Sequence, residues 1–193
     1  MPYKYIPNLL SIMRIVLAPI FILVMFANTF YMKLFALIIF FIGSLSDFLD
    51  GYLARKFNYI TEIGKFIDPV ADKILIVSAF IVLNYFYNDI VESWMIIVII
   101  SRDIFITCAR YIFIKYYDAT IKTSIFGKLK TLFQIIVVHI ILLLHFYNSD
   151  LITDFKIYSF SFIYILMIGC VIFTVSSGLH YLYVNFLNDL NES

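Results

Sequence analysis

Residues 157–188 read IYSFSFIYILMIGCVIFTVSSGLHYLYVNFLN and contain no Asp, Glu, Lys or Arg. A bilayer has a hydrocarbon core about 30 Å thick, which an α-helix of about 20 apolar residues can cross. At 1.5 Å per residue, these 32 residues would extend about 48 Å as a helix. The stretch therefore predicts a membrane-spanning helix whose last turns, around Tyr181–Leu187, tilt or project into the cytosol.

The rest of the chain repeats this pattern. Other uncharged runs occupy residues 15–32, 34–46, 74–88, 93–101 and 131–149. The shorter runs reach the length of a span only if charged residues enter the membrane. We therefore predict an all-α integral membrane protein, with residues 1–193 forming a single bundle. Its six transmembrane helices are expected at about 8–29, 32–57, 67–88, 93–117, 126–147 and 157–187.

The composition excludes several classes of protein. Hydrophobic residues make up 63% of the chain and charged residues 14%, whereas a soluble domain has about 45–50% and about 25%. The net charge of +1 provides no basic field for nucleic acid, so no nucleic-acid partner is expected. The two cysteines, Cys108 and Cys170, lie in apolar runs and are interpreted as small hydrophobic residues.

The distribution of basic residues predicts the orientation, because cytoplasmic loops are enriched in Lys and Arg. If the N-terminus is inside, only Lys33 and Lys156 lie outside. We therefore expect both termini in the cytoplasm. The basic residues at or near the cytoplasmic face are then Lys4, Arg55, Lys56, Lys65, Lys115, Lys122, Lys128 and Lys130.

Four aspartates lie where membrane helices are expected. The second helix ends in LSDFLDGYLARKF (45–57), and the third begins with IGKFIDPVADKIL (63–75). Asp47 and Asp50 share one helical face, and Asp68 and Asp72 are four residues apart on another. Carboxylates at a membrane border are costly to bury and are by default interpreted as functional.

Four neighbouring carboxylates cannot all stay ionised in a low dielectric without cations. Oxygen-only ligand sets suit Mg²⁺ or Mn²⁺, so the pattern predicts a site for two divalent ions. Gly51, Ala54 and Gly64 leave room for a ligand, and Arg55 offers a planar fork for a phosphate. Pro69 is expected in the first turn of its helix, where its missing N–H is tolerated. The alternative is that the aspartates cap helix ends and pair with Lys56, Lys65 and Lys73.

The stretch 47–72 reads D-x2-D-G-x2-A-R-x8-G-x3-D-x3-D. This pattern, with eight fixed positions over 26 residues, resembles the signature of the CDP-alcohol phosphatidyltransferases. Several other segments resemble the bacterial phosphatidylglycerophosphate synthases within that family. They are IPNLLSIMRIVLAPIF (6–21), ISRDIFITCAR (100–110), GKLKTLFQ (127–134) and VIFTVSSGLHYL (171–182).

The resemblance implies a six-helix enzyme, usually a homodimer, in the bacterial plasma membrane, with a two-metal site open to the cytoplasm. The implied reaction belongs to phospholipid biosynthesis. It joins CDP-diacylglycerol and sn-glycerol 3-phosphate into phosphatidylglycerophosphate and releases CMP.

The resemblance also assigns roles to residues. Asp47, Asp50, Asp68 and Asp72 would hold the metals. Asp72 is also the candidate general base, with a metal-bound water as the competing proton acceptor. The nucleotide would be lined by Gly51, Ala54, Arg55, Thr61 and Gly64. The acceptor phosphate would be bound by Arg102, Arg110, Lys128 and Lys130.

Alternatives remain open at this point. Arg102 and Asp103 could form a buried structural pair, and Lys128 and Lys130 could be positive-inside anchors. The acceptor could be serine, inositol phosphate or phosphatidylglycerol, although the basic residues favour a phosphorylated one. A different class, an ion or proton transporter, would need carboxylates along a path across the bilayer. The four aspartates instead cluster at one end of their helices.

Overall fold

The computed structural model describes residues 6–27, 29–57, 62–117, 125–147 and 162–192. The side chains of residues 6–7, 48, 50–57, 62–69, 72, 110–117, 125, 147 and 185–192 are not described. The described residues form helices and short connections, without a strand. The helices are α1 (Ile6–Phe26), α2 (Phe30–Phe57), α3 (Glu62–Phe86), α4 (Ser93–Tyr117), α5 (Ile125–Tyr147) and α7 (Phe162–Glu192). The predicted all-α architecture of six helices is confirmed.

Helix α3 begins earlier than predicted. It starts at Glu62 rather than near residue 67, so Asp68 and Pro69 lie in its second turn. The expectation that Pro69 belongs to the first turn was wrong. The prediction followed the start of the apolar run, whereas backbone hydrogen bonding extends the helix through the polar residues before it.

Helix α7 also differs from its predicted limits. It ends at Glu192, beyond the predicted end near residue 187, and comprises 31 residues. The predicted start at residue 157 lies outside the described residues. A helix of this length extends about 46 Å, which is more than a bilayer core of about 30 Å.

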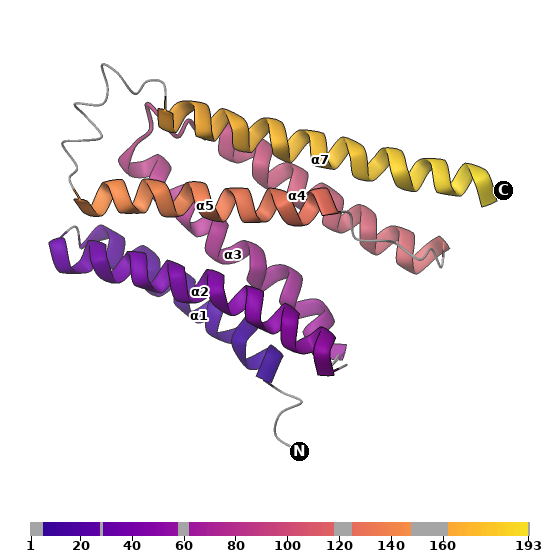
Figure 1. Ribbon diagram of the computed structural model, residues 1–193, viewed down its shortest axis with the longest axis horizontal. Coiled ribbons are helices and arrows are strands. Elements are labelled where there is room, and N and C mark those ends of the chain that lie inside the picture. The colour runs from indigo at the N-terminus through magenta and orange to yellow at the C-terminus, as the bar shows by residue number, and fades with distance from the viewer. Residues whose placement is uncertain (1–5, 28, 58–61, 118–124, 148–161, 193) are drawn as a thin grey trace.

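Successive helices run in alternating directions. The starts of α1, α3 and α5 and the ends of α2, α4 and α7 lie toward one end of the molecule, on the right in Figure 1. The opposite end carries the short α1–α2 and α3–α4 connections (Figure 1). The end of α2 and the start of α3, which carry the signature aspartates, therefore lie at the same end as the start of α5 and the last turns of α4 (Figure 1).

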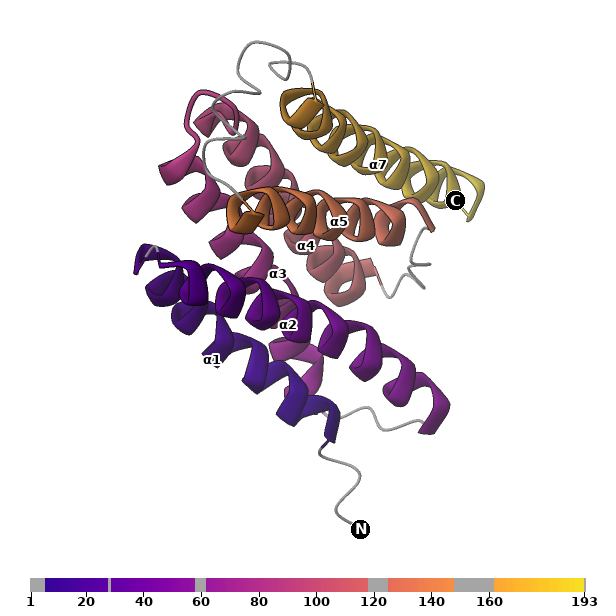
Figure 2. The same cartoon turned by 60° about the vertical axis from the view of Figure 1, so that its left-hand side comes forward.

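The helices pack in two connected groups (Figures 1 and 2). Helix α1 packs against both α2 and α3, while α7 packs against α4 and α5. Contacts from α2 to α5 and from α3 to α4 join the groups. One apolar core runs through both, and Phe21 and Phe40 form one of its ring contacts, with centroids 5.9 Å apart.

Within the described parts of the chain, four helices are each long and apolar enough to cross a membrane. These spans are Asn8–Phe26, Phe30–Asp47, Phe126–Phe146 and Phe162–Val184. Helix α3 contributes a shorter apolar segment, Lys73–Phe86, and α4 carries Arg102 and Asp103 within its length. Large apolar side chains such as Leu23 and Ile172 are exposed, as expected where lipid replaces water. The chain is a multi-pass membrane protein.

Candidate active site

The four signature aspartates lie at one end of the bundle. Asp47 and Asp50 belong to the last three turns of α2, and Asp68 and Asp72 to the first three turns of α3. Four residues connect Phe57 to Glu62, so the two helix ends lie at most about 19 Å apart. The side chains of Asp50, Asp68 and Asp72 lie outside the described residues.

Asp47 forms an ion pair with Arg14 of α1. Arg14 Nη1 donates to Asp47 Oδ1 over 2.6 Å. The Arg14 side chain is 1% exposed, whereas that of Asp47 is 30% exposed. Arginine stays protonated in proteins, so Asp47 supplies the countercharge that a buried guanidinium requires. Arg14 lies within the apolar sequence of α1, and its partner comes from α2, 33 positions further along the chain.

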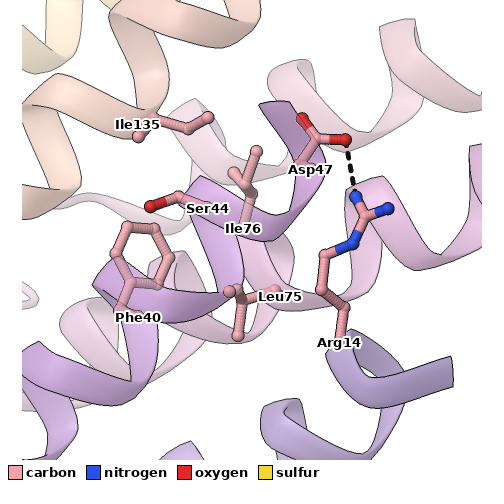
Figure 3. A pocket seen from close by; sticks show the side chains of 8 residues that line it. Arg14, Phe40, Ser44, Asp47, Leu75, Ile76 and Ile135 are labelled. Carbon is pink, nitrogen blue, oxygen red and sulfur yellow. Dashed lines mark hydrogen bonds and ion pairs between the residues drawn. The ribbon is translucent and has the colours of Figure 1, made fainter. Parts of the chain in front are cut away.

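A small pocket lies directly beside this pair (Figure 3). Arg14 and Asp47 border it, and Figure 3 shows their side chains pointing toward each other. Its other lining residues come from α2, α3 and α5 and are mostly apolar: Phe40, Gly43, Ser44, Leu75, Ile76 and Ile135. Asp47 and Arg14 thus form the charged part of a pocket whose other lining residues are mostly apolar.

A second polar cluster surrounds Asp103 in α4. Lys130 Nζ of α5 donates to both carboxylate oxygens of Asp103, over 2.6 Å to Oδ1 and 2.5 Å to Oδ2. Arg102 Nη1 donates to the same Oδ1 over 3.0 Å. Arg102 Nη2 also donates to Ser177 Oγ of α7 over 2.8 Å.

Lys73 connects this cluster to the signature helix. Its Nζ donates to the Asp103 backbone carbonyl over 3.3 Å and to the Thr107 hydroxyl. The Thr107 hydroxyl donates in turn to the Asp103 carbonyl over 2.7 Å. Lys73 directly follows Asp72 in the sequence, so α3 contacts α4 immediately after the last signature aspartate.

The structure brings together two of the four residues predicted to bind the acceptor phosphate. Arg102 and Lys130 share Asp103, while Lys128 is exposed two residues earlier on α5. Arg110 lies two turns beyond Arg102 on α4, and its side chain is not described. Asp103 and Lys73, which the sequence did not single out as site residues, link the cluster.

The residues predicted to line the nucleotide lie on the signature helices. Gly51, Ala54 and Arg55 fall in the last turns of α2, and Gly64 falls in the first turn of α3. Their side-chain surroundings and the whole of Thr61 lie outside the described residues.

Comparison with known proteins agrees with this arrangement. The sequence model of the CDP-alcohol phosphatidyltransferase family matches residues 4–176. The chain belongs to this family. Membership makes it a transferase and removes support from the transporter interpretation.

Curated members of the family are similar over most of their length. A Bacillus subtilis protein named CDP-diacylglycerol–glycerol-3-phosphate 3-phosphatidyltransferase is 37% identical over 188 residues, covering 91% of this chain and 92% of its own. Proteins of the same name from Rickettsia typhi and Escherichia coli are 34% and 33% identical. They cover 72% and 68% of this chain and 77% and 72% of their own lengths.

The donor set of this phosphatidyltransferase fits divalent metal ions. The signature supplies carboxylate oxygens only, the ligand chemistry that Mg²⁺ and Mn²⁺ prefer. Asp47 is partly exposed and its carboxylate has about four acceptor sites. It can therefore keep its hydrogen bond from Arg14 and also coordinate a cation.

Proposed function

We propose that this phosphatidyltransferase transfers the phosphatidyl group of CDP-diacylglycerol to sn-glycerol 3-phosphate. The products would be phosphatidylglycerophosphate and CMP, in bacterial phospholipid biosynthesis. The observation that carries the choice of acceptor is the buried pair of cations, Arg102 and Lys130, which share the single carboxylate of Asp103. Their side chains are only 15% and 5% exposed.

The charge of this cluster favours a phosphorylated acceptor. Two cations and one carboxylate, none of them more than 15% exposed, leave an excess positive charge that an anionic ligand would compensate. Serine would bring its own ammonium group and is a poorer match. Arg110 and Lys128, on the same helices, are proposed to complete the binding of the phosphate.

The CDP-lipid is proposed to bind at the signature. Asp47, Asp50, Asp68 and Asp72 would hold two Mg²⁺ or Mn²⁺ ions. When bound, such ions neutralise the charge of a diphosphate and the charge that develops at the transferred phosphorus. Gly51, Ala54, Arg55, Thr61 and Gly64 would contact the nucleotide, with Arg55 donating to phosphate.

The chemistry then requires one proton acceptor. The primary hydroxyl of glycerol 3-phosphate attacks the phosphorus that carries the lipid, a new P–O bond forms, and the bond to CMP breaks, so that CMP leaves. Asp72 is proposed to take the hydroxyl proton. Its neighbour Lys73 donates to the Asp103 carbonyl of α4, the helix that also carries Arg102, and this contact supports the assignment.

We also propose that the site opens to the cytoplasm of a bacterial cell, with both termini inside, and that the enzyme is a homodimer. The alternating directions of the six helices support the proposal that both termini lie on the same side of the membrane. The distribution of Lys and Arg supports the proposal that this side is the cytoplasm. The homodimer rests on resemblance to the family.

The test is an assay of CMP release by the purified protein. With CDP-diacylglycerol we expect release on addition of glycerol 3-phosphate, but not of serine, inositol phosphate or phosphatidylglycerol. EDTA should abolish release, and Mg²⁺ or Mn²⁺ should restore it. A preference for another acceptor would refute the proposed substrate, and full activity in a thoroughly chelated sample would refute the metal site.

A further inference from the structure

Asp103 is the point at which four helices are connected by polar contacts. Its carboxylate binds Lys130 of α5, and its backbone carbonyl accepts from Lys73 of α3. Through Arg102 the network extends to Ser177 of α7. Asp103 itself belongs to α4, so the contacts of Asp103 and its neighbour Arg102 connect α4 to α3, α5 and α7.

The closeness of the two cations depends on this carboxylate. Lys130 Nζ and Arg102 Nη1 donate to the same oxygen, Oδ1, over 2.6 and 3.0 Å. The two nitrogens therefore lie no more than about 5.6 Å apart. Two like charges at such a distance repel, and burial strengthens the repulsion. Among the described residues, Asp103 supplies the carboxylate that pairs with both Arg102 and Lys130.

The same spacing suits a phosphate monoester. Charged nitrogen-to-phosphate hydrogen bonds are about 2.7–2.9 Å long, so one phosphate can bridge two nitrogens that lie no more than about 5.6 Å apart. Lysine has three N–H donors and arginine five. The contacts with Asp103 and Ser177 do not exhaust these donors.

We propose that Asp103 is a positioning residue for the acceptor phosphate, holding Lys130 and Arg102 at the spacing that one phosphate monoester bridges. The inference rests on the proposed function and assigns Asp103 no contact with the reacting atoms. The inference predicts the direction in which removal of the carboxylate changes acceptor binding. A carboxylate that merely competed with phosphate for the two cations would weaken acceptor binding, and its removal would tighten it. A positioning carboxylate has the opposite effect.

The experiment compares Asp103→Asn with Asp89→Asn in the full-length protein in nanodiscs. Asp89 is exposed in the α3–α4 connection, so it receives the same substitution away from the cluster. For Asp103→Asn we expect the KM for glycerol 3-phosphate to rise roughly 10-fold or more, the usual effect of losing a charged hydrogen bond. The KM for CDP-diacylglycerol should stay within about twofold. Inorganic phosphate, used as a competitive inhibitor against glycerol 3-phosphate, should show a parallel increase in its inhibition constant.

The outcomes separate the inference from the proposed function. An unchanged or lower KM for glycerol 3-phosphate, or an equal rise for both substrates, would overturn the positioning role. If the wild-type protein releases no CMP with glycerol 3-phosphate, the proposed function itself fails.

A second variant covers the case in which Asp103→Asn does not fold. Ser177→Ala removes the contact of Arg102 with α7 without changing any charge. We expect it to raise the KM for glycerol 3-phosphate by a few-fold and to leave the KM for CDP-diacylglycerol unchanged. Asp103→Glu should restore much of the acceptor affinity, because it keeps the carboxylate. Wild-type kinetics in Ser177→Ala together with no recovery in Asp103→Glu would contradict the proposal.

Discussion

At the scale of single residues, charges buried in apolar helices are paired between helices. Arg14 contacts Asp47 across 33 positions of sequence, and Lys130 contacts Asp103 across 27. Removing one partner of a buried pair leaves an uncompensated charge and is strongly destabilising. Variants at these positions therefore need a measurement of folding beside every measurement of activity.

The proposed base gives a prediction at this scale. Asp72→Asn keeps the size of the side chain and one oxygen ligand but removes the proton acceptor. We expect kcat to fall about 10²–10⁴-fold, the usual contribution of general-base catalysis. Binding of CDP-diacylglycerol should survive better than in Asp47→Asn, which removes charge from a proposed metal ligand. Two-substrate steady-state kinetics of the purified variants would measure both effects.

Arg110→Ala provides the contrasting variant. It should raise the KM for glycerol 3-phosphate and leave the KM for CDP-diacylglycerol nearly unchanged, while Arg55→Ala should do the reverse. A near-normal kcat in Asp72→Asn would mean that the proton leaves by another route.

At the scale of helices, three glycines report how closely the elements approach. A Cβ on Gly43 of α2 would overlap Leu75 Cδ2 of α3, and one on Gly178 of α7 would lie 3.0 Å from Arg102 Nε. A Cβ on Gly169 would meet only the ring of Phe133, at 3.5 Å, which is an ordinary contact. At Gly43 and Gly178, therefore, the neighbouring helix lies too close for a methyl group unless a side chain moves. At Gly169 a methyl group fits.

Alanine substitution at these glycines should therefore give different results. In an exposed helix interior, Gly→Ala stabilises by about 1 kcal/mol through helix propensity. Gly169→Ala should keep or raise the melting temperature. Gly43→Ala should lower it, because Leu75 must move. Gly178→Ala should retain stability near wild type but weaken acceptor binding by shifting Arg102.

Thermal unfolding in one detergent, with kinetics of the same samples, tests this series. Equal melting temperatures for Gly43→Ala and Gly169→Ala would show that α2 and α3 do not approach as closely as described.

At the scale of the whole molecule, alternating helices place the signature at the same end as the exposed Lys128. Asp89 lies in the connection at the opposite end. This separation makes the orientation in the membrane testable with two single-cysteine variants. The two native cysteines, the exposed Cys108 and the buried Cys170, are first replaced by serine so that neither can react with the thiol reagent.

We expect Lys128→Cys to react with a membrane-impermeant thiol reagent only from the cytoplasmic side. Asp89→Cys should react only from the outside of intact cells. The excess of Lys and Arg at the end that carries Lys128 is the physical reason. The reverse labelling pattern would invert the topology and remove the site's access to cytoplasmic glycerol 3-phosphate.

The sequence by itself determined the helices, because each depends on local properties. Uncharged runs, the shorter ones extended by neighbouring charged residues, predicted the six elements. The limits that were wrong, at the start of α3 and the end of α7, fall where apolar runs meet polar residues. Hydropathy marks the edge of the membrane, but a helix continues as long as its backbone hydrogen bonds do. The spacing of the aspartates and the family signature are likewise properties of a short stretch.

Only the tertiary structure decided which charges meet. Periodicity places Arg102 and Lys130 on their own helices, but it does not say which helices become neighbours. The contact of Arg102 with Ser177 spans 75 positions, and that of Arg14 with Asp47 spans 33. Such pairs depend on which helix faces pack together, because the many apolar residues on each helix allow several packings. The role of Asp103 as the shared partner of two cations therefore became visible only in three dimensions.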